Sequence, residues 1–373
     1  MAHISGNPWP LFKLVFQNLP ISYKRIPLLG LYFVKLLVLL PFGVIEYIWY
    51  SKKIKQTPIT QAPIFIIGHY RSGTTFLHQL LALDGQFGYF TNVDTLFPYL
   101  PHWLEKRVKK YLQWMADKLQ VEYFHLNKVK LQVNDPMEED MCMISHGLSH
   151  SAYWGYLFAS KAAYYLDRFI FFNHEKDKQA WKESYLYQLK KMTLKCGGKQ
   201  LILKNPPNTG RIRTLLEMFP QARFIYLHRH PYQIFYSMQG LWNHTIEKYY
   251  SLQVISCQQK EAVIFNHYLK LMRQYDQDKY LIPAGNLLQC RFEDLGLYPE
   301  SEIKKIYHFF HLQNSEAVSY KIGQKLNTQQ KYVKFNYTTS SETEEKINHY
   351  WKDYIERYQD VSPLSDTKHA TFT

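Results

Sequence analysis

Cysteines and acidic residues are both scarce in this chain of 373 residues. The four cysteines, Cys142, Cys196, Cys257 and Cys290, include no CxxC pair, which argues against a zinc knuckle and a dense disulfide framework. A reduced compartment fits this spacing, although one disulfide is compatible with it. Asp and Glu number 31 against 45 Lys and Arg, which gives a net charge of +14. We therefore expect an anionic partner, such as a nucleotide, nucleic acid, a sulfated or phosphorylated substrate, or acidic lipid headgroups.

Long apolar runs are absent except for Ile26–Tyr50. This run could span a bilayer, which needs about 20 apolar residues. Lys35, Glu46 and a break at Pro41 are unfavourable for an isolated span, and basic residues flank both ends. The open alternatives are a helix in or on the membrane or docked on the main domain, and a single membrane span, whereas the late start disfavours a cleaved signal peptide.

The chain is expected to divide near Gln61. Residues 1–60 are predicted to form a membrane-associated helical segment, and residues 61–373 the main domain. We expect a cytoplasmic, membrane-associated protein, with a single-span membrane protein as the alternative. The 31 Tyr residues fit a ring-lined cleft or a membrane-facing surface, and they fit ordinary core and surface positions equally well.

Short apolar runs alternate with helical patterns throughout the main domain. The runs of strand length are Pro63–Ile67, Gln200–Leu203, Phe224–Leu227 and Leu287–Phe292. Their alternation with helices predicts an α/β fold, a P-loop-like parallel sheet flanked by helices. Ligands of such sheets bind at the carboxyl ends of the strands. Leu96–Tyr187 is predicted to be a helical insertion that forms much of an acceptor pocket, and Glu342–Gln359 a further helix.

The first strand is followed by a glycine turn, Gly68 to Thr75, that opens into a helix. A strand, a glycine turn and a helix start direct backbone N–H groups and the positive end of the helix dipole at one anion. The glycine spacing is that of a P-loop, but Thr74 takes the place of the lysine that reaches the β- and γ-phosphates. Kinase or nucleoside-triphosphatase chemistry is therefore disfavoured, while Arg71 offers a fork of donors for a phosphosulfate.

A second candidate phosphate site follows the strand Phe224–Leu227. Arg229 stands at the end of this strand, and Ser237 lies eight residues later on the next helix, after Pro231. The two side chains can donate to one phosphate. A structural salt bridge of Arg229 and a surface serine would explain the same residues without a ligand.

These two segments resemble the family of sulfotransferases that use 3'-phosphoadenosine-5'-phosphosulfate (PAPS), in its bacterial-type branch. The resemblance extends over roughly Pro63 to Tyr307 and includes Leu203–Pro207, Leu215–Pro220 and the Phe292–Leu295 element, which we interpret as structural support. It implies PAPS as sulfuryl donor. It also implies roles for two groups of residues, the 5'-phosphosulfate ligands Arg71, Ser72, Gly73, Thr74 and Thr75 and the 3'-phosphate ligands Arg229 and Ser237.

The reacting centre needs a base and a positive charge near the acceptor hydroxyl. Lys204, at the end of a predicted strand, could stabilise the sulfuryl or bridging oxygens, and a solvated lysine would fit the same position. Asp135–Asp140 is an acidic cluster at a helix start, where capping is the structural alternative. The resemblance implies a glutamate as the base, which leaves Glu138 or Glu139. The family's histidine after the strand-end lysine is Asn208 here, which leaves the orientation of the acceptor open.

His146 and His150 have a spacing that can bind metal on one helix face, but no third ligand is apparent, and we expect no metal. The predicted reaction is transfer of a sulfuryl group from PAPS to the hydroxyl of a small molecule, lipid or other amphipathic alcohol. An acidic glycan would suit the positive charge as well. The alternatives are a non-catalytic PAPS- or nucleotide-binding protein and a P-loop kinase. A membrane surface is a further expected partner and nucleic acid is not.

Overall fold

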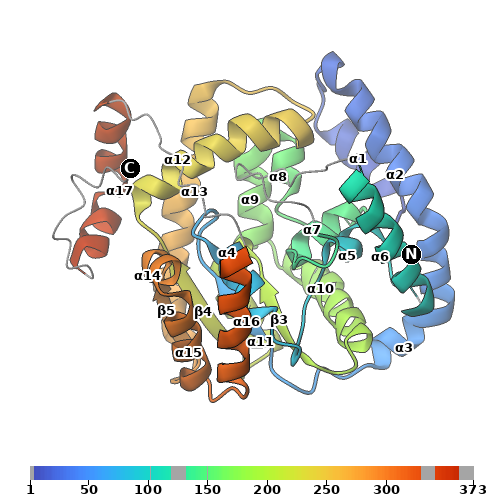
Figure 1. Cartoon of the computed structure of the whole chain (residues 1–373). Coiled ribbons are helices and arrows are strands. Elements are labelled where there is room, and N and C mark those ends of the chain that lie inside the picture. Colours follow the sequence, from blue (N-terminus) through green and yellow to red (C-terminus); the bar gives the residue numbers. More distant parts are fainter. Residues whose placement is uncertain (1–3, 101, 119–131, 149, 329–340, 361–373) are drawn as a thin grey trace.

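The computed structural model describes residues 4–100, 102–118, 132–148, 150–328 and 341–360 (Figure 1). A sheet of five parallel strands, ordered β2-β3-β1-β4-β5, lies at its centre. The strands are β1 (Ile64–Ile67), β2 (Phe87–Gly88), β3 (Gln200–Lys204), β4 (Arg223–His228) and β5 (Leu287–Arg291). The predicted parallel α/β sheet is confirmed, and four of its strands coincide with the four apolar runs. The edge strand β2 was missed because two residues show no period.

The two faces of the sheet bury different side chains, as the alternation along a strand requires. Phe65 and Ile67 of β1 pack on one face, and Ile64 and Ile66 pack on the other. The first face is covered by α10 (Glu175–Lys195), α11 (Ile212–Met218) and part of α13 (Cys257–Asp278). The second is covered by α4 (Thr74–Leu81), α14 (Phe292–Leu297), α15 (Pro299–Phe309) and α16 (Ser315–Thr328). The sheet is therefore buried on both sides, which explains why its strands are apolar throughout.

The insertion between the second and third strands is helical, as predicted. It contains α5 (Asn92–Leu96), α6 (His102–Lys118), α7 (Glu139–Ser145), α8 (Trp154–Leu157), the 3₁₀ turn η3 (Ala159–Lys161), α9 (Ala162–Ile170) and α10. No strand occurs in its described part, although Thr91 and Pro136 form an isolated antiparallel bridge. This bridge holds the chain just before α7, where the acidic cluster lies.

The N-terminal helices form one side of the molecule (Figure 1). They are α1 (Trp9–Gln17), the short turn η1 (Tyr23–Arg25), α2 (Ile26–Ile45), the π-helical segment η2 (Glu46–Tyr50) and α3 (Ser51–Gln56). The expected break at Pro41 was wrong, because Pro41 lies inside α2 and the helix continues past it. Tyr23–Gln56 is the one helix of the described residues long and apolar enough to cross a membrane, by length and composition.

A third apolar cluster joins the N-terminal helices to the rest of the chain. Leu11 and Leu14 of α1 and Leu36 of α2 are buried in it together with Trp154 and Phe169. The other elements that contribute are α12 (Pro231–Leu241), the π-helical η5 (Trp242–Tyr250), α13 and α17 (Ser341–Asp360). Helix α17 confirms the predicted C-terminal helix, with a kink at Trp351. The remaining 3₁₀ turns are η4 (Pro206–Gly210) and η6 (Lys279–Leu281), and all four cysteines are free.

Candidate active site

The loop between β1 and α4 is shaped by two glycines whose conformations exclude a side chain. Gly68 has φ 147°, and a Cβ there would lie 2.3 Å from the Leu227 carbonyl oxygen. Gly73 has φ 95°, and its Cβ would lie 2.0 Å from the Phe292 ring. Any other residue at either position would displace a strand or the ring that supports the loop. The loop is thus held against β4 and α14, and Phe292 has the supporting role that we expected of its segment.

The same loop has the donors that an anion with several oxygens would need. Helix α4 begins at Thr74, directly after Gly73, so its first N–H groups open toward the loop. The Ser72 side chain is fully buried, and its hydroxyl has no hydrogen-bond partner. A buried hydroxyl without a partner is costly unless a ligand satisfies it. These features fit the phosphosulfate end of PAPS.

The two candidate phosphate sites lie side by side. Arg71 Nε donates a hydrogen bond to Ser237 Oγ at 2.8 Å, and Arg229 Nη1 donates to the Arg71 carbonyl oxygen at 3.0 Å. The Arg229 guanidinium lies 4.5 Å from the centre of the Phe292 ring. Arg71 has φ 69°, a strained conformation for a non-glycine residue, which these contacts hold in place. The structure therefore brings together residues from three segments that are far apart in the sequence.

Glu138 and Lys204 meet beside this loop. Lys204 ends β3, is almost fully buried, and donates from Nζ to Thr75 Oγ1 at 3.1 Å and to Glu138 Oε1. Glu138 stands at the N-cap position of α7 without a side-chain capping bond, and its second carboxylate oxygen accepts a hydrogen bond from the Tyr153 hydroxyl. Burial raises the pKa of Tyr153 well above its ordinary value, so the phenol remains a neutral donor. Lys204 thus links the helical insertion to the phosphate loop.

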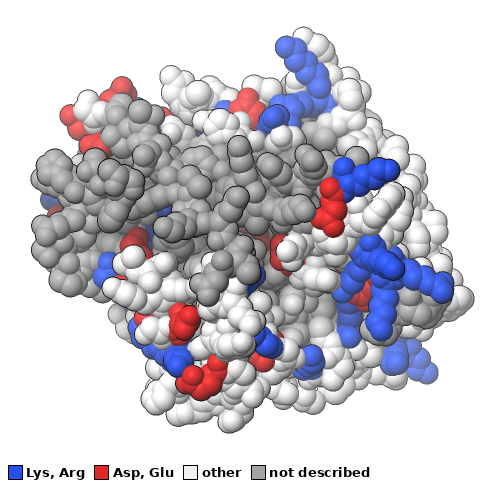
Figure 2. Space-filling model, viewed as in Figure 1, with Lys and Arg blue, Asp and Glu red and all other residues white. Residues whose placement is uncertain are grey.

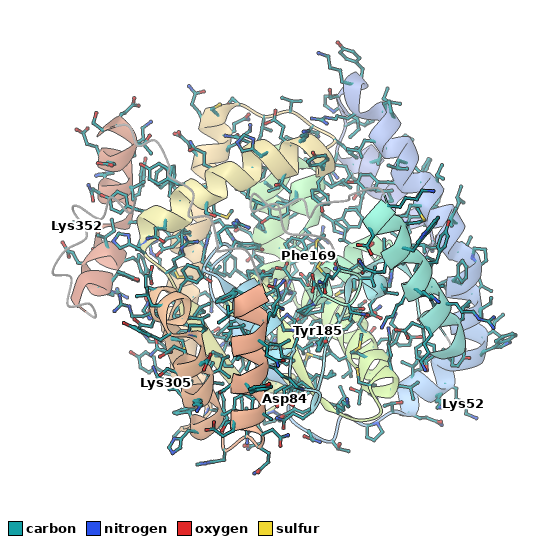
Figure 3. The ribbon with its side chains drawn as sticks, in the orientation of Figure 1. Lys52, Asp84, Phe169, Tyr185, Lys305 and Lys352 are labelled. Atoms are coloured by element: carbon teal, nitrogen blue, oxygen red, sulfur yellow. The ribbon has the colours of Figure 1, made fainter. Side chains whose placement is uncertain are left out.

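Glu139 has a different set of partners although it follows Glu138 in the chain. Its Oε1 accepts hydrogen bonds from Tyr185 Oη at 2.7 Å and from Asn208 Nδ2 at 2.9 Å. Burial raises the pKa of this carboxyl to about 7. Figure 3 shows Tyr185, from α10, in the interior of the molecule. Asn208, at the position where the family resemblance left the acceptor's orientation open, contacts Glu139 and Tyr185.

A fully buried ion pair fixes the start of α7. Arg211 Nη2 donates to Asp140 Oδ2 at 3.0 Å, and both side chains have no exposed surface. Arg211 also donates from Nε to the Phe169 carbonyl oxygen at 2.8 Å and lies 4.5 Å from the centre of the Trp181 ring. A buried pair with this many additional contacts orients its helix firmly. Glu138 is therefore held on a rigid support.

The pair His146 and His150 does not form the helical arrangement that the spacing suggested. Helix α7 ends at Ser145, so the two histidines do not share a helix face. His146 is buried, and burial lowers its pKa well below the ordinary value. Across the described residues, no group of three or more His, Cys, Asp or Glu side chains is placed to hold a metal ion.

Comparison with known proteins identifies the family. Residues 63–316, more than half of the chain, match the model of the sulfotransferase family. The chain belongs to this sulfotransferase family. Over 321 residues the sulfotransferase is 26% identical to the omega-hydroxy-beta-dihydromenaquinone-9 sulfotransferase Stf3 of Mycobacterium bovis, and the alignment covers 85% of this chain and 80% of the relative. The Stf3 protein of Mycobacterium tuberculosis is similar to the same extent.

Two solved structures share the fold of this sulfotransferase. Sulfotransferase STF9 from Mycobacterium avium has a TM-score of 0.71 at 16% identity, with 91% of this chain and 88% of that chain covered. Sulfotransferase STF1 from Mycobacterium tuberculosis has a TM-score of 0.61 at 19% identity, with 79% of each chain covered. The protein is thus a PAPS-dependent sulfotransferase by family, and this family membership decides against the kinase alternative.

The structure also places residues that the sequence did not single out. Tyr153 contacts the Glu138 carboxylate, and Thr209 accepts the Gly68 N–H at 2.8 Å. Tyr153 stands among many aromatic residues of the insertion, so no spacing distinguished it. Thr209 follows the Leu203–Pro207 element by two residues, and that nearness is the signal that could have found it.

Proposed function

We propose that this sulfotransferase transfers the sulfuryl group of PAPS to the hydroxyl of an amphipathic, lipid-like alcohol, with Glu138 as the general base. The observation that supports this assignment is the line of contacts from Thr75 through Lys204 to Glu138. This line joins the loop that would hold the donor to Glu138. Of the pair Glu138 and Glu139, Glu138 is the carboxylate that contacts Lys204. The pKa of about 7 would favour Glu139 as a base, but its Oε1 contacts Tyr185 and Asn208 rather than Lys204.

PAPS supplies the sulfuryl group when bound. In the proposed site Arg71, Ser72, Gly73, Thr74 and Thr75 hold the 5'-phosphosulfate. Arg229 and Ser237 hold the 3'-phosphate. The contact between Arg71 and Ser237 places the two groups of donors next to each other, as binding of a single PAPS molecule requires.

The proposed transfer is an in-line displacement. The Glu138 carboxylate accepts the proton of the acceptor hydroxyl while the acceptor oxygen forms the new bond to sulfur. The bond between sulfur and the bridging oxygen breaks, and its electron pair stays on the departing phosphate. Lys204 and the N–H groups at the start of α4 stabilise that negative charge. Tyr153 holds the Glu138 carboxylate in position.

The proposed acceptor class rests on the aromatic side chains around Glu138. Tyr153 and Tyr156 stack with ring centres 5.2 Å apart, Tyr70 lies 6.2 Å from Tyr153, and Trp242 lies 5.6 Å from Tyr156. Rings of this kind favour a large apolar body next to a hydroxyl. The related Stf3 is named for a hydroxylated menaquinone, which is a lipid-like acceptor.

The test is transfer of radiolabelled sulfate from PAPS to isoprenoid alcohols in detergent micelles, compared with simple phenols and with acidic glycans. We expect labelled isoprenoid alcohol. Glu138→Gln should lower kcat by about a hundred- to ten-thousandfold while the Kd for PAP, the desulfated product, stays unchanged. Glu139→Gln is the matched control and should lower kcat less than about tenfold.

Ser237→Ala separates donor binding from base catalysis. Removal of one hydrogen bond to a charged phosphate should raise the Kd for PAP about tenfold.

A larger loss of kcat for Glu139→Gln than for Glu138→Gln would overturn the assignment of the base. Labelled glycan without labelled isoprenoid alcohol would overturn the acceptor class.

A further inference from the structure

An extended apolar surface lies on the outer side of the N-terminal helices. We call this surface the α1–α2 face. Its large exposed residues are Trp9, Phe12 and Phe16 of α1, Leu31, Val34, Leu37 and Val38 of α2, and Ile48 and Trp49 of η2. Only 17% of the most apolar window of Tyr23–Gln56 is buried, whereas a core helix would be mostly buried. A contiguous surface of this kind on a soluble domain marks an interaction site.

The opposite side of α2 is attached to the catalytic domain. Its buried residues Leu36, Leu39 and Gly43 and, in η2, Glu46 recur at intervals of three and four, which is one face of a helix. Glu46 accepts hydrogen bonds from Tyr99 N at 2.6 Å and Tyr187 Oη at 3.1 Å and pairs with Lys191 Nζ at 3.3 Å. Lys35 donates to Ser145 Oγ. Both charges of the apolar run therefore have partners in the domain.

The charges around the α1–α2 face are almost all positive. Glu46 is the only carboxylate in residues 4–60, and it is buried. Lys24 lies just before α2, and Lys52, Lys53 and Lys55 lie in α3 at its far end, all of them exposed. Figure 2 shows many basic and few acidic side chains on this side of the molecule, and Figure 3 places Lys52 at the outer edge.

We propose that the α1–α2 face docks in the plane of an anionic bilayer, with the apolar residues in the headgroup and acyl boundary and the lysines at the level of the phosphates. Cations at both ends suit a helix that lies flat, because both ends then meet the same charged surface. A membrane span would require Lys35 and Glu46 to leave their partners and enter hydrocarbon. The inference deepens the proposed function and rests on it for the acceptor's class.

The N-terminal helices also share an apolar cluster with the proposed site. Leu14 of α1 and Leu36 of α2 belong to the same apolar cluster as Tyr70 and Tyr153 beside Glu138. The side of the N-terminal helices that faces the domain is therefore continuous with the aromatic residues of the site.

The test is cosedimentation of the full-length protein with sucrose-loaded vesicles, without PAPS or acceptor. We expect binding to vesicles of phosphatidylglycerol and phosphatidylcholine and at least about tenfold weaker binding to phosphatidylcholine alone. Ile48→Ser with Trp49→Ser should weaken the partition about tenfold or more. Leu297→Ser with Tyr298→Ser is the matched control, because these residues are exposed to 71% and 65% against 67% and 70% for Ile48 and Trp49. Equal loss in both double variants would overturn the proposal.

A charge arm uses the lysines of α3. Lys52→Gln, Lys53→Gln and Lys55→Gln together should weaken binding to the anionic vesicles about a hundredfold. The matched control, which removes the same charge elsewhere on the exposed surface, is Lys176→Gln, Lys199→Gln and Lys321→Gln. An equal effect of both triple variants would show attraction by net charge alone and would contradict a docking face.

A topology arm distinguishes docking from spanning. In a Cys257→Ser background, Lys24→Cys and Lys52→Cys are each labelled with a membrane-impermeant maleimide after the protein is bound to sealed vesicles. In-plane docking predicts labelling at both ends of the helix, and protection of one end would show a span.

A dimer in solution that is broken by Ile48→Ser with Trp49→Ser, without vesicle binding, would assign the face to a second copy and overturn the proposal. If the protein does not bind vesicles but still transfers sulfate to isoprenoid alcohol in micelles, the docking proposal is wrong and the proposed function stands. Vesicle binding without any transfer would instead count against the proposed function.

Discussion

At the scale of single residues, Glu138 and Glu139 show how the start of a helix separates two neighbouring carboxylates. Glu138 stands at the N-cap position with an extended backbone, whereas Glu139 is the first helical residue of α7. Glu138 therefore reaches Lys204 and Tyr153, while Glu139 enters the interior beside Tyr185. The sequence placed both carboxylates in one acidic cluster and could not separate them.

The raised pKa of Glu139 has a consequence for stability. Burial raises it from 4.5 to about 7, so between these pH values the folded chain holds a proton that the unfolded chain releases. The free energy of unfolding therefore falls as pH rises through this window. Glu139→Gln should remove this fall in the free energy of unfolding, because the amide does not titrate. Its oxygen can still accept hydrogen bonds from Tyr185 and Asn208. We expect the variant to gain about 1 to 3 kcal/mol relative to wild type between pH 5 and pH 8, measured by urea unfolding.

The control for this measurement is Glu183→Gln, which changes an exposed carboxylate on the same helix as Tyr185. It should show the same difference from wild type at both pH values. A relative stability of Glu139→Gln that does not change between pH 5 and pH 8 would mean that Glu139 is ionised in the folded chain throughout this range.

At the scale of elements, the charges in the apolar run of α2 take on a different meaning from the one that the sequence suggested. Lys35 and Glu46 were unfavourable for an isolated span. In the structure each contacts the domain, Lys35 at Ser145 and Glu46 at Lys191. The charges thus specify which side of the helix faces the protein.

The Glu46 contacts should be essential for stability. The Glu46 and Lys191 side chains are only 2% and 7% exposed. Glu46→Ala would leave the lysine buried without its carboxylate, and we expect a loss of about 3 to 5 kcal/mol in the free energy of unfolding. The control Glu316→Ala removes the exposed partner of Lys304, and its loss should stay below about 1 kcal/mol. Equal losses in urea unfolding would show that Lys191 is solvated in the variant.

At the scale of the whole molecule, residues 1–60 share a core with the remainder of the chain. Leu11, Leu14 and Leu36 are buried in the cluster that also contains Trp154 and Phe169. The division into residues 1–60 and 61–373 remains a prediction about sequence organisation, and the packing suggests that the two parts fold together.

Deletion of residues 1–60 tests this dependence. The shortened chain would expose the apolar cluster around Trp154, so we expect a lower Tm, binding of the dye ANS and aggregation, in contrast to the full chain in the same buffer. Calorimetry and light scattering measure these outcomes. A soluble shortened chain with an unchanged Tm would instead support an independent domain.

The sequence by itself determined the parallel sheet, its four longer strands and the glycine turn between β1 and α4, because these features depend on local patterns. Apolar runs of strand length, the spacing of Gly68 and Gly73, and Arg229 at a strand end are all visible in short segments. Tertiary structure alone decided the contact of Arg71 with Ser237, the different surroundings of Glu138 and Glu139, and the side of α2 that faces the domain. These depend on which separate segments the fold brings together, and contacts between such segments leave no mark in the local sequence.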